Sequence, residues 1–98
     1  MVYKIKITAD AKQDLDYFKT YDKKVIVTAI KKQLTYEPSV ETKNRKKLRE
    51  NPLATWELRS GRFRIFYEVV EDTVQVIVIS VGIKDHNVLY IRGREVII

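Results

Sequence analysis

Residues 55–82 read TWELRSGRFRIFYEVVEDTVQVIVISVG and contain three successive strand patterns, which decide the fold. Apolar and polar residues alternate over 55–60 and again over 62–70, and Ser60-Gly61 between them is typical of a tight turn. Residues 74–81 are nearly all apolar, which is typical of a central strand covered on both faces. The stretch therefore predicts a three-stranded antiparallel meander.

Upstream of the meander, residues 3–8 alternate as one strand with a buried face, and two helices follow. The apolar stripes of the helices consist of Ala11, Leu15 and Phe18, and then of Val25, Ile26, Ala29, Ile30 and Leu34. Thr8 or Asp10 can cap the first helix, Asp22 can cap the second, and the second ends before Pro38. The short link between the stripes predicts an antiparallel helix hairpin.

This order of elements, β-α-α-β-β-β, predicts an α+β fold of one domain, residues 1–98. We expect a two-layer sandwich with the N-terminal strand and the α-hairpin packed on a mainly antiparallel sheet. Residues 37–53 are interpreted as a loop with a short ordered piece at 46–49, and 84–90 as a polar segment with one helical turn. The short C-terminal segment, 91–98, has no unambiguous pattern.

The composition excludes several classes of protein. Of the 98 residues, 45% are hydrophobic and 33% charged, which argues against intrinsic disorder. No apolar run reaches the length of a membrane-spanning helix, and the first residues contain no signal-peptide core. With no cysteine and one histidine, the chain has no thiol nucleophile or disulfide, and we expect neither a metal nor a cofactor. These features predict a cytoplasmic domain.

The net charge of +6 is unevenly distributed. Residues 41–64 hold eight basic and three acidic side chains, a net +5, whereas 65–83 hold three acidic side chains and no basic one. A concentrated basic stretch is typical of proteins that bind a polyanion, and also of a solvated surface that favours solubility. Charge alone leaves both interpretations open.

Alternation along the strands indicates where some of these charges lie. Thr55, Glu57 and Arg59, and then Arg62, Arg64 and Phe66, point away from the apolar residues of their own strands. If the helices cover one face of the sheet, the other face becomes a basic platform with an aromatic ring in it. Phe66 can stack there on a base or lie buried under the C-terminal tail.

Three stretches together resemble one family. They are KKLR at 46–49, WELRSGRFRIFYEV at 56–69 and VISVGIKDHNVLY at 78–90. They are similar to the RelE/ParE superfamily of toxins from type II toxin–antitoxin systems, and the resemblance covers nearly the whole chain. It implies a fold that serves two activities, which are ribosome-dependent cleavage of messenger RNA in RelE-like members and inhibition of DNA gyrase in ParE-like members.

The resemblance also implies roles for particular residues. Arg64 matches the family's transition-state arginine, Lys84 a position often held by arginine, Tyr90 the C-terminal functional tyrosine and Arg59 a recurrent arginine. Lys46, Lys47 and Arg49 lie in the stretch that would meet ribosomal RNA. We include Lys43, Arg45 and Arg62 with them as RNA-binding candidates.

This sequence departs from the best-known RelE pattern on the second strand. That pattern has two lysines, one of them the presumed base, where this chain has Thr55 and Glu57. Other ribosome-dependent relatives use a carboxylate with a histidine for proton transfer. Glu57 and His86 would take these roles if folding brings them together. A surface ion pair for Glu57 and an idle surface position for His86 are the alternatives.

The resemblance leaves three functions open. The first is a metal-independent, ribosome-dependent messenger RNA endoribonuclease, which inhibits translation and is neutralised by a cognate antitoxin. The second is a ParE-like gyrase inhibitor without catalysis. The third is an inert relative that acts only in antitoxin binding. The expected partners are the antitoxin, the ribosome and messenger RNA, with operator DNA contacted only through the antitoxin.

Overall fold

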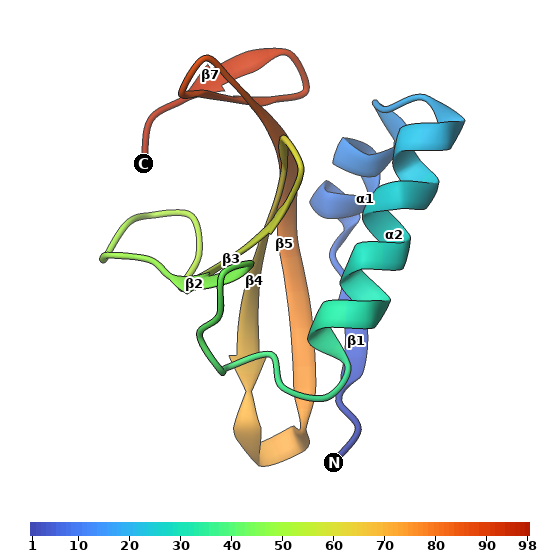
Figure 1. Cartoon of the computed structure of the whole chain (residues 1–98), viewed down its shortest axis with the longest axis vertical. Helices are drawn as coiled ribbons and strands as arrows, with labels where there is room; N and C mark the ends of the chain where they lie inside the picture. Colours follow the sequence, from blue (N-terminus) through green and yellow to red (C-terminus); the bar gives the residue numbers. More distant parts are fainter.

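The chain folds as one strand, two helices and six further strands, and the computed structural model describes all of residues 1–98 (Figure 1). The elements are β1 (Lys4–Ile7), α1 (Ala9–Asp16), α2 (Thr20–Leu34), β2 (Arg45–Lys47), β3 (Trp56–Ser60), β4 (Phe63–Val70), the 3₁₀ turn η1 (Glu71–Thr73), β5 (Gln75–Asp85), β6 (Val88–Ile91) and β7 (Arg94–Val96). The predicted α+β sandwich and its meander, β3–β4–β5, are confirmed.

All seven strands belong to one sheet with the order β2-β3-β4-β5-β6-β7. β5 is its centre, because β4 pairs with it along one edge, and β1 and β6 pair with its two halves. β1 is the one parallel partner, with Lys4 opposite Gln75 and Ile7 opposite Val78, and every other pairing is antiparallel. The sheet is therefore mainly antiparallel, as predicted.

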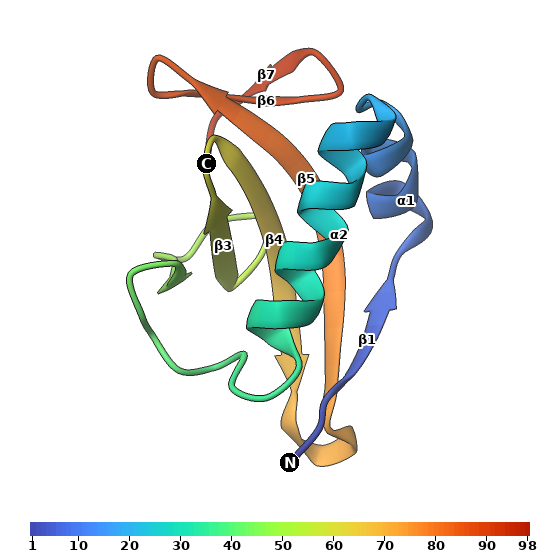
Figure 2. The ribbon, with the colours of Figure 1, turned by 45° about the vertical axis from the view of Figure 1, so that its right-hand side comes forward.

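Both helices lie on the same face of the sheet (Figure 2). The Thr8 hydroxyl accepts a hydrogen bond from the Ala11 N–H and caps α1, as predicted. The expected cap at Asp22 is wrong, because α2 begins earlier, at Thr20, with Lys19 as its N-cap and no side-chain cap bond. Asp22 instead lies in the first turn, where its charge favours the positive end of the helix dipole. Neither helix has the length and apolar character that crossing a membrane requires.

The main core lies between the helices and the sheet. The predicted helix stripes supply Ala11, Leu15, Ile26, Ile30 and Leu34, and the strands supply Trp56, Leu58, Ile65, Tyr67, Val76, Val78 and Val81. The Trp56 and Tyr67 rings stack across β3 and β4 with their centroids 6.0 Å apart. The Tyr67 hydroxyl donates to the carbonyl of Pro38 at 2.6 Å, so it satisfies its buried polar group and fixes the chain after α2.

The opposite face of the sheet, called the outer face here, is partly covered. Ala54, Phe66 and Leu89 form a second buried cluster under the loop at residues 48–55 and the last two strands. Phe66 is 0% exposed there, so burial under the tail is confirmed and the ring is not free to stack on a base. The expectation of a fully open platform is wrong because the outer face carries enough apolar surface to need its own cover.

Three segments without clear sequence patterns contain strands. Residues 45–47 form the short edge strand β2 within the predicted loop. Residues 84–90 contain no helical turn, because β5 continues to Asp85 and a turn leads directly into β6. His86 and Asn87 form that turn with φ of 50° and 66°. The ambiguous tail supplies β7, which pairs with β6.

The turn between β6 and β7 is attached to α1. Arg92 Nε lies 2.8 Å from Asp14 Oδ1, and its Nη1 donates to Gln13 Oε1. The other Asp14 oxygen accepts from the Ser80 hydroxyl and the Val81 N–H on β5. The buried Asp14 carboxylate thus joins a helix, the central strand and the C-terminal hairpin.

Candidate functional site

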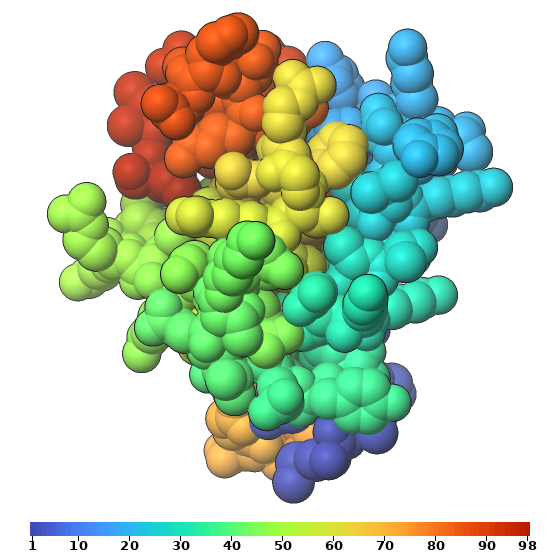
Figure 3. Space-filling model, in the orientation of Figure 1, coloured from blue at the N-terminus to red at the C-terminus, as the bar shows by residue number.

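A groove crosses the outer face between the 48–55 loop and the C-terminal strands. The loop side is lined by Leu48, Arg49, Glu50 and Asn51, the sheet by Glu57, Arg59 and Lys84, and the tail by Ile98. This part has a volume of about 500 Å³. A second depression continues from it toward β6 and β7, and Glu57, Lys84 and Ile98 line both. In the space-filling view the loop and the C-terminal segment stand out as two lobes on the same side (Figure 3).

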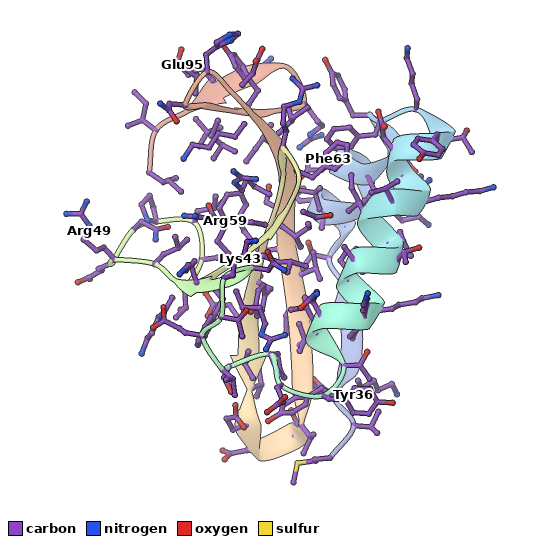
Figure 4. The ribbon with its side chains drawn as sticks, viewed as in Figure 1. Tyr36, Lys43, Arg49, Arg59, Phe63 and Glu95 are labelled. Atoms are coloured by element: carbon purple, nitrogen blue, oxygen red, sulfur yellow. The ribbon has the colours of Figure 1, made fainter.

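Three predicted site residues meet on β3 and β4. Glu57 and Arg59 share one face of β3, and Arg64 lies directly opposite Arg59 on β4. Glu57 Oε1 lies 2.8 Å from Arg59 Nε, and the carboxylate is buried while the guanidinium stays partly exposed. Figure 4 shows Arg59 between the 48–55 loop and the C-terminal hairpin. The floor of the groove therefore holds the Glu57–Arg59 ion pair, and Arg64 adjoins Arg59 on the next strand.

Arg64 is held in place by the turn that precedes it. Its Nη1 donates to the carbonyls of Gly61 and Phe63, at 2.8 and 2.9 Å. Its Nε is buried without a hydrogen-bond partner. Burial lowers the pKa of the Arg64 guanidinium from its usual value, the nearby Glu57 raises it, and Arg59 lowers it. These two bonds fix the guanidinium beside Arg59 and leave it a positive charge next to the groove.

Lys84 joins these residues from the central strand. β5 places it next to Leu89 of β6, and its backbone N–H donates to the Arg62 carbonyl. Its side chain is half-buried and lines both parts of the groove together with Glu57. The groove thus combines the Glu57 carboxylate with cations from β3, β5 and the 48–55 loop, an arrangement that can bind a phosphate and accept a proton beside it.

Tyr90 and His86 are not brought to this groove. Tyr90 pairs with Ile83, so strand alternation puts it on the face opposite Lys84. His86 is at the tip of the β5–β6 hairpin with its side chain 93% exposed, and its Nδ1 lies 3.0 Å from Asp85 Oδ1. Neither residue lines the groove that holds Glu57.

The RNA-binding candidates separate into buried and exposed groups. Arg45 is 8% exposed, and its guanidinium donates to the Val40 carbonyl and to both the carbonyl and the side chain of Gln33. It ties the loop to α2, so its prediction as an RNA contact is wrong. Lys46 lies opposite Glu57 on the outer face and is half-buried. The exposed candidates are Lys43, Lys47, Arg49 and Arg62, the last 3.6 Å from Asp85.

Asn51 is a site residue that the sequence analysis missed. Its side-chain amide donates to the carbonyls of Arg49 and Ala54, and its oxygen accepts from the N–H groups of Leu53 and Ala54. These bonds shape the loop that forms one wall of the groove and carries Arg49 at its edge (Figure 4). The dipeptide Asn51-Pro52 is a known turn signal and offered the clue. No cluster of three or more histidine, cysteine or acidic side chains suited to a metal ion is present.

Solved structures that are similar to this chain include the following three. The toxin–antitoxin complex RelBE2 of Mycobacterium tuberculosis matches with a TM-score of 0.71 and 22% identity, covering 86% of this chain and 100% of that chain. The archaeal RelE–RelB complex of Pyrococcus horikoshii matches with a TM-score of 0.66 and 22% identity, and the match covers 96% of this chain and 99% of that chain. An arginine double mutant of Escherichia coli toxin RelE in the free state matches with a TM-score of 0.65 and 28% identity, and the match covers 84% of this chain and 83% of that chain.

Comparison with curated protein sequences gives no match. The model of a protein family does match: residues 5–92 fit the family described as the ParE toxin of the type II toxin–antitoxin system parDE. That match spans both helices and every strand of the groove except β7, whose hairpin partner β6 is included. The sequence motifs, the fold and the family match therefore agree, and the chain belongs to the RelE/ParE superfamily as the toxin of a type II toxin–antitoxin system.

Proposed function

We propose that this toxin is a ribosome-dependent endoribonuclease that cleaves messenger RNA and so inhibits translation in the cytoplasm. The observation that carries the proposal is the groove in which the Glu57 carboxylate adjoins Arg59 and faces Lys84 across the sheet. A phosphodiester needs cations to offset the charge of its transition state, and a neighbouring base to activate its nucleophile. The groove offers both within one surface.

In the proposed step, the 2′-oxygen of the messenger attacks the adjacent phosphorus while Glu57 accepts the 2′-hydroxyl proton. The bond from phosphorus to the 5′-oxygen of the next nucleotide breaks, and the Lys84 ammonium donates a proton to that oxygen. Arg59 and Arg64 stabilise the charge on the phosphate oxygens. The products are a 2′,3′-cyclic phosphate and a free 5′-hydroxyl. The resemblance suggested His86 for this proton only if folding brought it to Glu57; His86 is exposed and outside the groove, so we propose Lys84 instead.

Arg49, Lys46, Lys47 and Lys43 extend the basic surface beyond the groove. We propose that this surface contacts ribosomal RNA and that the ribosome orients the messenger in the groove. The antitoxin neutralises the toxin, and we expect the complex to reach operator DNA only through the antitoxin.

A primer-extension assay on messenger RNA bound to purified ribosomes tests the proposal. Wild-type protein should cut within the A-site codon, and Lys84→Met should lose most of that cleavage, because the groove then lacks one cation. Lys12→Met, which removes an exposed lysine from α1, is the matched control and should cut normally. Wild-type protein that folds, binds its antitoxin and leaves the messenger intact would contradict the proposal.

A second candidate, inhibition of DNA gyrase, is favoured by the ParE description of the matching family. It requires a binding surface and no catalytic groove. Induction of the gene alone distinguishes the two: translation arrest supports the ribonuclease, and an SOS response with active translation supports the gyrase inhibitor.

A further inference from the structure

A second basic surface lies on α2, on the helical side of the molecule. Lys24, Thr28 and Lys32 follow one another at intervals of four residues, which places successive side chains about 6 Å apart along the helix. Lys24 and Thr28 line one shallow depression, and Thr28 and Lys32 line the next. The two depressions are therefore contiguous.

The second of these depressions reaches the candidate site. It lies between α2 and the β3–β4 turn, and its far wall consists of Asn44, Arg59, Ser60 and Gly61. The N–H of Arg59 donates to the Asn44 carbonyl at 2.8 Å, which fixes this wall. Arg59 also lines the outer-face groove, so the same side chain borders both surfaces. A series of cations thus runs from the groove around the sheet edge to α2.

The lining of these depressions differs from that of the groove. No acidic side chain lines either depression, whereas the groove contains Glu50 and Glu57. Polar groups that can donate hydrogen bonds accompany the lysines, among them Thr28, Gln33 and Asn44. The exposed large apolar side chains, such as Tyr17, Tyr21 and Tyr36, lie outside both. Val25, Val27 and Ala29 also line the depressions, but they are small and half-buried, so they offer little anchorage to a docked protein helix. The basic lining without acidic side chains instead suits a phosphate backbone.

We infer that Lys24 and Lys32 bind the sugar–phosphate backbone of RNA and form a track that leads through Arg59 into the groove. The inference rests on the proposed function for its substrate class. Binding would release counterions from the RNA, so the track adds affinity that falls with salt, without sequence preference. Lys23 is excluded from the track because it is paired with Asp16.

The test measures the affinity of the full chain for a labelled 20-nucleotide polyuridine over a range of salt concentrations. Lys24→Gln/Lys32→Gln should bind more weakly, and the slope of log K against log salt should become shallower by about 1.4, or 0.7 for each lost contact with single-stranded RNA. Lys6→Gln/Lys12→Gln removes the same charge from exposed positions on β1 and α1 and should keep the wild-type slope. Equal slopes for the wild type and the α2 variant, or equal losses in the two double variants, would overturn the inference.

A parallel titration with poly-L-glutamate separates RNA from an acidic protein partner. The inference predicts that Lys24→Gln/Lys32→Gln loses more affinity for RNA than for polyglutamate. A loss of affinity for polyglutamate alone would overturn it. The ribosome assay keeps the two proposals apart. Absent cleavage with a shallower RNA slope removes the proposed function and leaves the track, whereas normal cleavage with an unchanged slope removes the track alone.

Discussion

Glu57 and Arg59 form an ion pair along one strand, with Oε1 and Nε 2.8 Å apart, in which the Glu57 side chain is 6% exposed and the Arg59 side chain 44% exposed. The pair lies at the floor of the groove, next to Arg64. Because Arg59 holds only one carboxylate oxygen at this distance, the carboxylate is fixed in orientation and still borders the groove. This geometry makes Glu57 the candidate proton acceptor.

Glu57→Gln should lower the single-turnover rate of messenger cleavage on ribosomes by about 10²–10⁴, the usual contribution of a general base. The amide keeps the size of the side chain, so the fold and antitoxin binding should be retained. Glu37→Gln, on an exposed residue after α2, is the matched control. A rate within twofold of the wild type would remove Glu57 from the mechanism.

The cleavage rates of Lys84→Met and Tyr90→Phe show whether the reaction depends more on Lys84, which lines the groove, or on Tyr90, which only the family resemblance implicates. Strand register puts Lys84 in the groove and Tyr90 on the other face, so the lysine variant should lose about 10²-fold in cleavage rate and the tyrosine variant less than about tenfold. Single-turnover rates measured side by side check this order. The reverse order would show that the groove is not the reaction site.

Asp14→Ala should lower the free energy of unfolding by about 2–3 kcal/mol, because the Ser80 hydroxyl and the Val81 N–H lose their shared acceptor in a buried place. Urea denaturation measures the difference. Asp16→Ala, which breaks only the exposed pair with Lys23, should have a much smaller effect. Equal effects would mean that the bonds from Asp14 to β5 do not stabilise the fold.

Tyr67 should make the protein sensitive to alkali. Burial raises the pKa of its phenol above the usual value of 10, so the folded state keeps a proton that the unfolded state releases. The contribution of the Tyr67 phenol to the free energy of unfolding is therefore constant below pH 9. Above pH 10 it falls by about 1.4 kcal/mol for each pH unit. Tyr67→Phe should remove that slope and cost about 1 kcal/mol at neutral pH through the lost bond to Pro38. Tyr36→Phe, at an exposed position, should change neither, and an unaltered alkaline slope in Tyr67→Phe would contradict the assignment.

The sequence predicted the parts of this fold whose signal is local. The apolar stripes of α1 and α2 and the alternation of β3 and β4 identify the elements and their buried faces. β2 was missed because three basic residues carry no apolar pattern and become a strand only by pairing with β3. The hairpin after Asp85 was missed because its turn contains no glycine, although Asn87 is a residue that tolerates positive φ.

The site was also predicted only in part, because strand alternation is a local pattern whereas burial and side-chain partners depend on the tertiary fold. Alternation placed Glu57, Arg59 and Arg64 together, and the structure agrees. Sequence alternation does not show whether a face of the sheet is covered. Phe66 therefore has two interpretations from the sequence, and the position of the 48–55 loop in the structure decides between them. Arg45 looked like its basic neighbours because its acceptors, the carbonyls of Val40 and Gln33, are assembled only by the tertiary fold. The position of Tyr90 required the register of β5 and β6.

The central claim is that this groove cleaves messenger RNA by attack of a 2′-hydroxyl. The most direct measurement programmes ribosomes with two messengers that differ only in a single 2′-deoxy nucleotide at the site cleaved in the A-site codon. The account predicts cleavage of the all-ribose messenger, with a 2′,3′-cyclic phosphate at the new end, and no cleavage at that position of the deoxy messenger. Equal cutting of both messengers, or of neither, would contradict it.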